Sequence, residues 1–323
     1  NATTEPQVGT PATFTYTIID NDGLGATGPG GVGNDTSNKI WLRADALDLA
    51  SGAGVETWTD VSGNDNNATQ TTGGRPTFQT GVMNGQPVIR FEDPNEGTDG
   101  DGDFLDTSSP GIGPTTGYTY FVVADLTADV TPGDEDDGAG TFILDRPESV
   151  NPLVSLKVLD DGGSPYPFGY QTRYNGDVTP DGLGAAQSTT TIGNTSGTPN
   201  IIAMQRDVGT AFRIFVDGTE EDTFADNGSN LTPPELRIGS HATTDAMDGD
   251  LPELIVFEGT LNATTRTLVE NYLSAKYDIA LSGTDVYAGD DAGNGNYDLG
   301  VFGIGREGAS DFHVAAETDG LRF

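Results

Sequence analysis

The chain has 323 residues, 34% of them hydrophobic, which is enough to bury the core of one large domain or two modest ones. Its 14 Lys and Arg against 50 Asp and Glu give a formal net charge of −36 at pH 7. Charge of that sign repels phosphate backbones and anionic lipid, which argues against nucleic acid and membrane surfaces as partners. The apolar runs fall far short of the roughly 20 residues of a membrane-spanning helix. Cysteine is absent, so disulfides and thiolate metal sites are excluded.

The first predicted element is a β-strand at residues 12–19, where apolar and polar residues alternate and Phe14, Tyr16 and Ile18 share one face. The Gly-rich run 23–33 follows and predicts a flexible linker. A strand tethered in this way has no adjacent hairpin partner, so its backbone groups must pair elsewhere. Two alternatives are open: the strand pairs within its own chain, or it completes the sheet of a neighbouring copy.

From residue 40 onward, short apolar runs separated by Gly, Asn, Asp and Pro predict an all-β sandwich or barrel. Asp217-Gly218 predicts a hairpin turn. One helix is expected, with Asn262 as N-cap and an apolar stripe that includes Lys276 and ends near Tyr277. After Leu281 we expect a small β piece, too small to bury a core alone, with strand-like runs at 299–304, 312–315 and 321–323. The other expected strands are 40–43, 87–91, 119–123, 141–144, 155–158, 201–204, 212–216, 235–238 and 254–257.

Several motifs in a fixed order carry a family resemblance. They are Trp-Leu-Arg-Ala-Asp at 41–45, Trp-Thr-Asp-Val-Ser-Gly-Asn at 58–64, Arg-Pro at 75–76, Asn-Gly-Gln-Pro-Val-Ile-Arg-Phe at 84–91, Leu-Arg-Ile-Gly at 236–239, Gly-Asp-Leu-Pro-Glu-Leu-Ile-Val-Phe at 249–257 and the helix end at 269–277.

Together these motifs resemble laminin G-like members of the concanavalin A-like lectin/glucanase superfamily, which are common in secreted bacterial surface proteins. The resemblance implies a jelly-roll sandwich over residues 38–281, preceded by a strand and linker at 1–37 and followed by a β extension at 282–323. It also implies an extracellular or cell-surface location. Function has to be argued from individual residues, because this fold carries lectins, enzymes, adhesion modules and spacers alike.

The residues argue against catalysis. Glucanases of the superfamily place two carboxylates on one strand, and the nearest match here is Glu253 and Glu258, with Ile255 where the central Asp belongs. Strand periodicity puts residues five apart on opposite faces. His241 and His313 do not have metal-ligand spacing. The two Trp residues are expected to pack in the core or against a sheet rather than stack on sugars.

The sequence offers more candidate residues for binding than for catalysis. Asp99, Asp101 and Asp103 alternate in a Gly-rich loop, a spacing that can wrap a calcium ion with oxygen ligands. Tyr166 and Tyr170 could form a glycan-binding platform, and the favoured alternative is that they belong to a packed strand. N-glycosylation sequons begin at Asn34, Asn67, Asn194, Asn227, Asn230 and Asn262.

Two functions follow from these observations. The first is a non-catalytic subunit of an extracellular filament, in which the strand 12–19 completes the sheet of a neighbouring copy and joins subunits head to tail. The second is a carbohydrate-binding or adhesion module of a secreted surface protein, assisted by calcium. The expected partners are therefore copies of the chain itself or extracellular glycans.

Overall fold

A computed structural model describes most of the domain between residues 28 and 301 and four short strands after it. The strand predicted at 12–19 lies outside the described residues. The described residues are 28–71, 73–92, 102–126, 141–146, 153–158, 166–173, 184–192, 197–226, 228, 235–240, 247–299, 301, 305–306, 312–313, 317–318 and 321–322.

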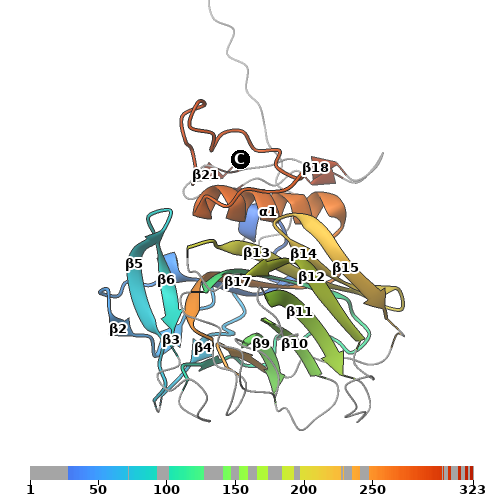
Figure 1. Cartoon of the computed structure of the whole chain (residues 1–323), viewed down its shortest axis with the longest axis horizontal. Coiled ribbons are helices and arrows are strands. Elements are labelled where there is room, and N and C mark those ends of the chain that lie inside the picture. Colours follow the sequence, from blue (N-terminus) through green and yellow to red (C-terminus); the bar gives the residue numbers. More distant parts are fainter. Residues whose placement is uncertain are drawn as a thin grey trace, which may run out of the picture.

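Two antiparallel sheets face each other, and helix α1 covers the outer side of the first (Figure 1). Within the described residues, sheet A has nine strands in the order β15-β14-β13-β8-β17-β6-β5-β2, with β1 pairing along β17. Its strands are β1 (Asn38–Arg43), β2 (Ala53–Gly54), β5 (Thr77–Met83), β6 (Gln86–Phe91), β8 (Tyr118–Leu126), β13 (Asn200–Asp207), β14 (Ala211–Val216), β15 (Thr219–Ala225) and β17 (Gly249–Glu258).

Sheet B has eight strands in the described residues, in the order β12-β11-β10-β9-β16-β7-β4-β3. This antiparallel arrangement confirms the predicted all-β jelly-roll sandwich. The strands are β3 (Thr57–Trp58), β4 (Ala68–Thr69), β7 (Leu105–Asp106), β9 (Thr141–Arg146), β10 (Leu153–Val158), β11 (Tyr166–Arg173), β12 (Gly184–Ile192) and β16 (Glu235–Ile238).

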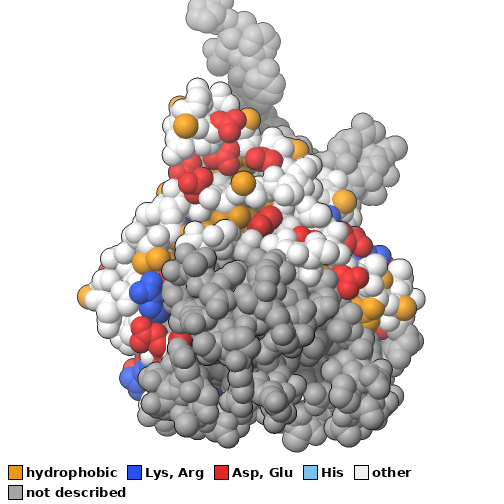
Figure 2. All heavy atoms as spheres, in the orientation of Figure 1, with side chains coloured by type: hydrophobic (Ala, Val, Ile, Leu, Met, Phe, Trp, Pro, Cys, Tyr) orange, Lys and Arg blue, Asp and Glu red, His pale blue; other side chains and the backbone are white. Residues whose placement is uncertain are grey.

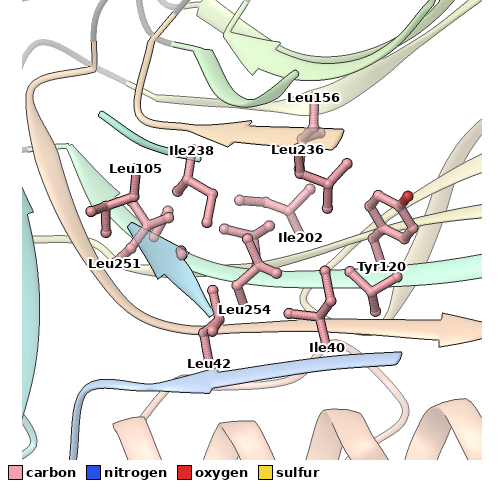
Figure 3. Packing of buried hydrophobic residues seen from close by; sticks show 14 of the residues in the cluster. Ile40, Leu42, Leu105, Tyr120, Leu156, Ile202, Leu236, Ile238, Leu251 and Leu254 are labelled. Carbon is pink, nitrogen blue, oxygen red and sulfur yellow. The ribbon is translucent and has the colours of Figure 1, made fainter. Parts of the chain in front are cut away.

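The main core fills the space between the two sheets, where side chains from both meet (Figure 3). Leu254 and Val256 of β17 point into this core, whereas Ile255 and Phe257 of the same strand pack on the other side, under α1. Because sheet A is covered on both faces, its central strands read as continuous apolar runs rather than as alternating ones. Trp58 is fully buried in the core, as predicted.

Helix α1 spans Ala263–Tyr277 and begins and ends as the sequence predicts. The side chain of Asn262 accepts a hydrogen bond from Thr265 N at 3.0 Å and caps the first turn. Asp278 closes the helix with φ of 56°, in the left-handed region. The Asp217-Gly218 turn is also confirmed, because both residues have positive φ between β14 and β15.

We expect Asn262→Ala to lower the free energy of unfolding by about 1 kcal/mol, because it leaves the Thr265 amide without its cap. Urea denaturation of the full chain measures the change. Asn262→Asp is the matched control. Its free energy of unfolding should stay close to that of the unmodified chain, since Asp caps helices as well as Asn does. Equal losses in both variants would contradict a capping role.

The structure corrects one linker prediction. Residues 28–31 are buried and include the short 3-10 helix η1 (Pro29–Gly31), which packs against α1. Gly30 has φ of 64°, and a Cβ there would stand 2.8 Å from the Leu268 carbonyl oxygen. These glycines therefore permit close packing of backbone on backbone rather than flexibility. A second 3-10 turn, η2 (Ala44–Ala46), follows β1.

After α1 the chain turns back over the helix, on the side away from sheet A (Figure 1). Leu299 lies in a turn, which corrects the strand expected to start there. Two small strand pairs follow, β18 (Gly305–Arg306) with β19 (Phe312–His313) and β20 (Glu317–Thr318) with β21 (Leu321–Arg322). Among the residues described, none of the helical segments is both long and apolar enough to cross a bilayer.

Candidate functional site

Most of the predicted assembly and calcium residues fall outside the described residues. Phe14, Tyr16 and Ile18 do, and so do Asp99 and Asp101. Asp103 is described, and its Oδ2 accepts a hydrogen bond from Glu92 N at 3.0 Å. The assembly strand and the calcium loop therefore stay predictions.

The positions of Tyr166 and Tyr170 are described through the backbone of β11. In the ladder between β10 and β11, the backbone of Tyr170 pairs with that of Leu156. The glycan-binding role of both tyrosines stays a prediction, and so does the alternative that they belong to a packed strand.

Three sequons lie in the described part of the chain and use their amide oxygens locally. Asn34 Oδ1 accepts from Thr36 N, Asn67 Oδ1 accepts from Asp60 N, and Asn262 caps α1. Glycosylation of all six sequons stays a prediction, because Asn194, Asn227 and Asn230 fall outside the described residues.

The densest group of buried polar side chains surrounds Glu253, between β17 and α1. Its Oε1 accepts from Trp41 Nε1 at 2.6 Å and from the Tyr272 hydroxyl at 3.1 Å. Its Oε2 accepts from Lys276 Nζ at 2.9 Å and from the Tyr277 hydroxyl at 2.7 Å. We call these five residues the Glu253 cluster. The sequence placed Glu253 only at the polar end of a core strand. The signal that could have found the cluster is Lys276, because a lysine on an apolar helix stripe requires a buried acidic partner.

Charge inside the Glu253 cluster is nearly balanced. Lys276 also contacts Asp45 Oδ1 at 3.1 Å, and Arg43 lies over the Trp41 ring. Burial alone would lower the pKa of Lys276, but the interactions with Glu253, Tyr272 and Asp45 together outweigh burial and raise it. Burial, together with the same charge, raises the pKa of Tyr277 well above its ordinary value.

These contacts make the Glu253 cluster a clamp between helix and sheet rather than a catalytic centre. Four donors already occupy both oxygens of the Glu253 carboxylate, and its side chain is fully buried. Glu258 pairs with Lys39 instead, at 2.7 Å. By strand alternation Glu258 lies on the opposite face of β17, as predicted, so the two carboxylates cannot flank one glycosidic bond.

The free edge of β1 is closed by the turn that follows β3. Asp60 accepts hydrogen bonds from Trp41 N, Ser62 N and Asn66 N, each at 2.9 Å. Asn66 Nδ2 donates to Lys39 O, and Val61 N donates to Trp41 O. Main-chain groups of β1 that another strand would need are therefore already bonded.

The long edge strands of the two sheets lie against each other. Strand β12 ends sheet B, strand β15 ends sheet A, and the two lie in contact (Figure 1). Thr190 of β12 donates its backbone N–H to Glu221 Oε2 of β15 at 2.7 Å, and its hydroxyl donates to Glu221 Oε1. Among the described strands of sheets A and B, only the two-residue β2 and β3 then end a sheet without such cover.

Every basic side chain whose placement is described has an acidic partner within 4 Å. Most of the 50 acidic residues have no basic residue to match, since the chain has only 14. Figure 2 shows Asp and Glu side chains gathered on the lobe above α1. The paired basic residues are Lys39, Arg43, Arg75, Arg90, Arg206, Arg213, Arg237, Arg266 and Lys276.

Part of that lobe is the segment 282–299, which we call the strap. Asn271 of α1 anchors it by accepting from Val286 N at 2.8 Å and Tyr287 N at 2.9 Å. At the other end, Asn84 in the β5–β6 turn donates to Asp298 Oδ2 at 3.1 Å. The strap is therefore held at both ends to the rigid part of the domain.

The comparisons with known proteins agree with this architecture. No protein-family model matches the chain, and no curated protein matches it. Among solved structures, domain 4 of AbnA, a GH43 extracellular arabinanase from Geobacillus stearothermophilus in complex with arabinotriose, is similar with a TM-score of 0.50 and 13% identity. That match covers 72% of this chain and 97% of that domain.

The binding domain of botulinum neurotoxin DC is also similar. In its complex with SialylT the TM-score is 0.52 at 11% identity, over 74% of this chain and 52% of that one. In its complex with rat synaptotagmin II the TM-score is 0.50 at 11% identity, over 73% and 51%. The chain thus spans about half the length of these toxin domains. At such low identity the likeness establishes the β-sandwich fold alone.

Proposed function

We propose that the chain is a non-catalytic carbohydrate-binding module. The observation that carries this proposal is the likeness in fold to the arabinanase domain, because it extends over 97% of a domain solved with an oligosaccharide. The toxin domain with SialylT adds a second sandwich solved with a bound ligand. Since one fold serves many functions, the proposal also needs support from this chain's own residues.

That support comes first from the carboxylates. Hydrolysis of a glycosidic bond needs two carboxyl groups beside one bond. Here Glu253 is bonded to four donors inside the domain and Glu258 to Lys39 on the other face of the strand. The motif that comes nearest to a catalytic one is thus used to hold the fold together, which favours binding over catalysis.

The sheet edges bear on the filament hypothesis. A donated strand needs a row of unpaired backbone groups on the acceptor. In the described part of the chain, β1 is closed by the Asp60 turn, and β12 and β15 cover each other. We therefore place filament assembly second, and its strand at 12–19 stays a prediction, as do the extracellular location and the laminin G-like assignment of residues 38–281.

We expect the full chain to bind at least one neutral oligosaccharide on an array that presents arabinose, xylose, glucose, galactose and mannose oligomers, arabinotriose among them. The array is read with and without a chelator. Binding that the chelator abolishes supports the predicted calcium ion at Asp99, Asp101 and Asp103. Binding in both conditions supports a module that binds glycans without calcium. If correctly folded protein binds no glycan in either condition, the proposal is wrong.

A further inference from the structure

We infer that the ligand is an uncharged oligosaccharide and that it binds on the strap, with Tyr297 as its stacking platform. This inference rests on the proposed function, because it names the surface and the ligand class of that same activity. It is carried by three features of the strap: an exposed aromatic ring, polar groups beside it and the sign of the local charge.

Tyr297 is the sole aromatic side chain that is strongly exposed among the described residues, with 62% of its surface accessible. Leu299, two positions later, is 49% exposed. Aromatic rings with one apolar face and a polar tip are common anchors of binding sites, since they bury a large area while their hydroxyl stays hydrated. Trp41 cannot serve in this way, because its ring lies against Tyr272 and its N–H is bonded to Glu253.

The ring of Tyr297 is held in place before any ligand arrives. Tyr297 N donates to Gly289 O at 2.8 Å, and the Tyr287 hydroxyl donates to Tyr297 O at 3.0 Å. The ring lies so close to Gly295 that a Cβ on this residue would stand 2.6 Å from it. Glycine at φ of 117° therefore lets the ring rest on the backbone, and such preorganisation reduces the entropy lost on binding.

Hydrogen-bonding groups flank the ring on both sides in the sequence. Asn296 Nδ2 donates to Asp298 Oδ2 at 3.1 Å, which fixes both side chains next to Tyr297. The Oδ1 atoms of these two residues remain available as acceptors within the described structure. Acceptors on the two residues that flank an exposed ring in the sequence can bond the hydroxyl groups of a sugar.

The charge of the strap selects against acidic sugars. Asp290 and Tyr287 both have raised pKa values, through partial burial and the nearby charges of Asp298 and other acidic residues. Each described basic side chain is already paired, so none is left to neutralise a ligand carboxylate or sulfate. The described part of the chain also has no cluster of three acidic or His side chains suited to a metal ion. An uncharged sugar fits these conditions best.

The test compares Tyr297→Ala with Tyr297→Phe, and with Leu49→Ala as a control on an exposed apolar residue outside the strap. Each full-length variant is titrated with the neutral oligosaccharide that binds best on the array, and with uronic-acid and sialylated oligosaccharides at low and high salt. We expect Tyr297→Ala to weaken binding of the neutral sugar about tenfold or more, and the other two variants to bind as the unmodified chain does. Acidic oligosaccharides should bind less than neutral ones at low salt.

The outcomes separate this inference from the proposed function. If neutral sugars bind and Tyr297→Ala has no effect, the strap is not the site while the module still binds glycans. Loss of binding in Tyr166→Ala or Tyr170→Ala instead would move the site to β11. Preferred binding of acidic sugars would overturn the ligand class. Binding of no sugar at all would overturn the proposed function, and this inference with it.

Discussion

Replacing Glu253 with alanine is expected to lower the free energy of unfolding by about 3–5 kcal/mol, the usual cost of removing one partner from a buried ion pair. The change leaves the charge of Lys276 with Asp45 alone and removes the acceptors of Trp41 Nε1 and the Tyr277 hydroxyl. A buried donor without an acceptor destabilises the folded state by the full cost of removing that donor from water. Urea denaturation followed by circular dichroism measures the difference.

Glu258→Ala is the matched control, because it removes a carboxylate five positions along the same strand. Its partner Lys39 and Glu258 itself are both partly exposed, so this ion pair contributes about 0–1 kcal/mol. The double variant Glu253→Leu with Lys276→Met should recover part of the loss, since an apolar pair leaves no buried charge unpaired. A Glu253→Ala variant as stable as Glu258→Ala would show that the cluster does not hold α1 to the sheet.

The secondary structure follows from the sequence wherever one physical cause dominates. Asn262 and the apolar stripe predict α1 to within a residue, because capping and periodicity are local. The run Leu254–Phe257 predicts β17, although its continuous apolar character reflects burial on both faces of sheet A. Strand β15 was missed because its Glu220-Glu221-Asp222 run has no apolar alternation, and it forms by pairing with β14.

Sites formed by distant residues are harder to predict. Trp41 and Glu253 are 212 positions apart and meet only because β1 pairs with β17, which no local pattern encodes. A lysine on an apolar helix stripe, such as Lys276, requires a buried acidic partner, but the sequence does not show which acid that is. Tyr297 was missed for another reason. It follows a Gly- and Asn-rich turn with no strand or helix period, so its exposure depends on how Asn271 and Asn84 anchor the strap.

Alkaline pH should destabilise the protein steeply through the Glu253 cluster. Tyr272, Tyr277 and Lys276 have pKa values above their ordinary values of 10.0, 10.0 and 10.5. Burial and the charge of Glu253 favour the protonated tyrosines. Burial disfavours the protonated lysine, but Glu253, Tyr272 and Asp45 together outweigh it. The unfolded chain therefore releases these protons first as pH rises. The contribution of these groups to the free energy of unfolding is fully present below about pH 10. Above that pH it falls by about 1.4 kcal/mol per pH unit for each group.

For three such groups the slope approaches about 4 kcal/mol per pH unit once all are ionised in the unfolded chain. The free energy of unfolding is measured in urea between pH 9 and pH 11.5 at constant ionic strength. Tyr277→Phe is the decisive comparison, because it removes one titrating group and should reduce the contribution of the cluster by about a third. Tyrosines elsewhere contribute equally to both proteins and cancel. If the two proteins show the same slope, the Tyr277 hydroxyl does not keep its proton against Glu253.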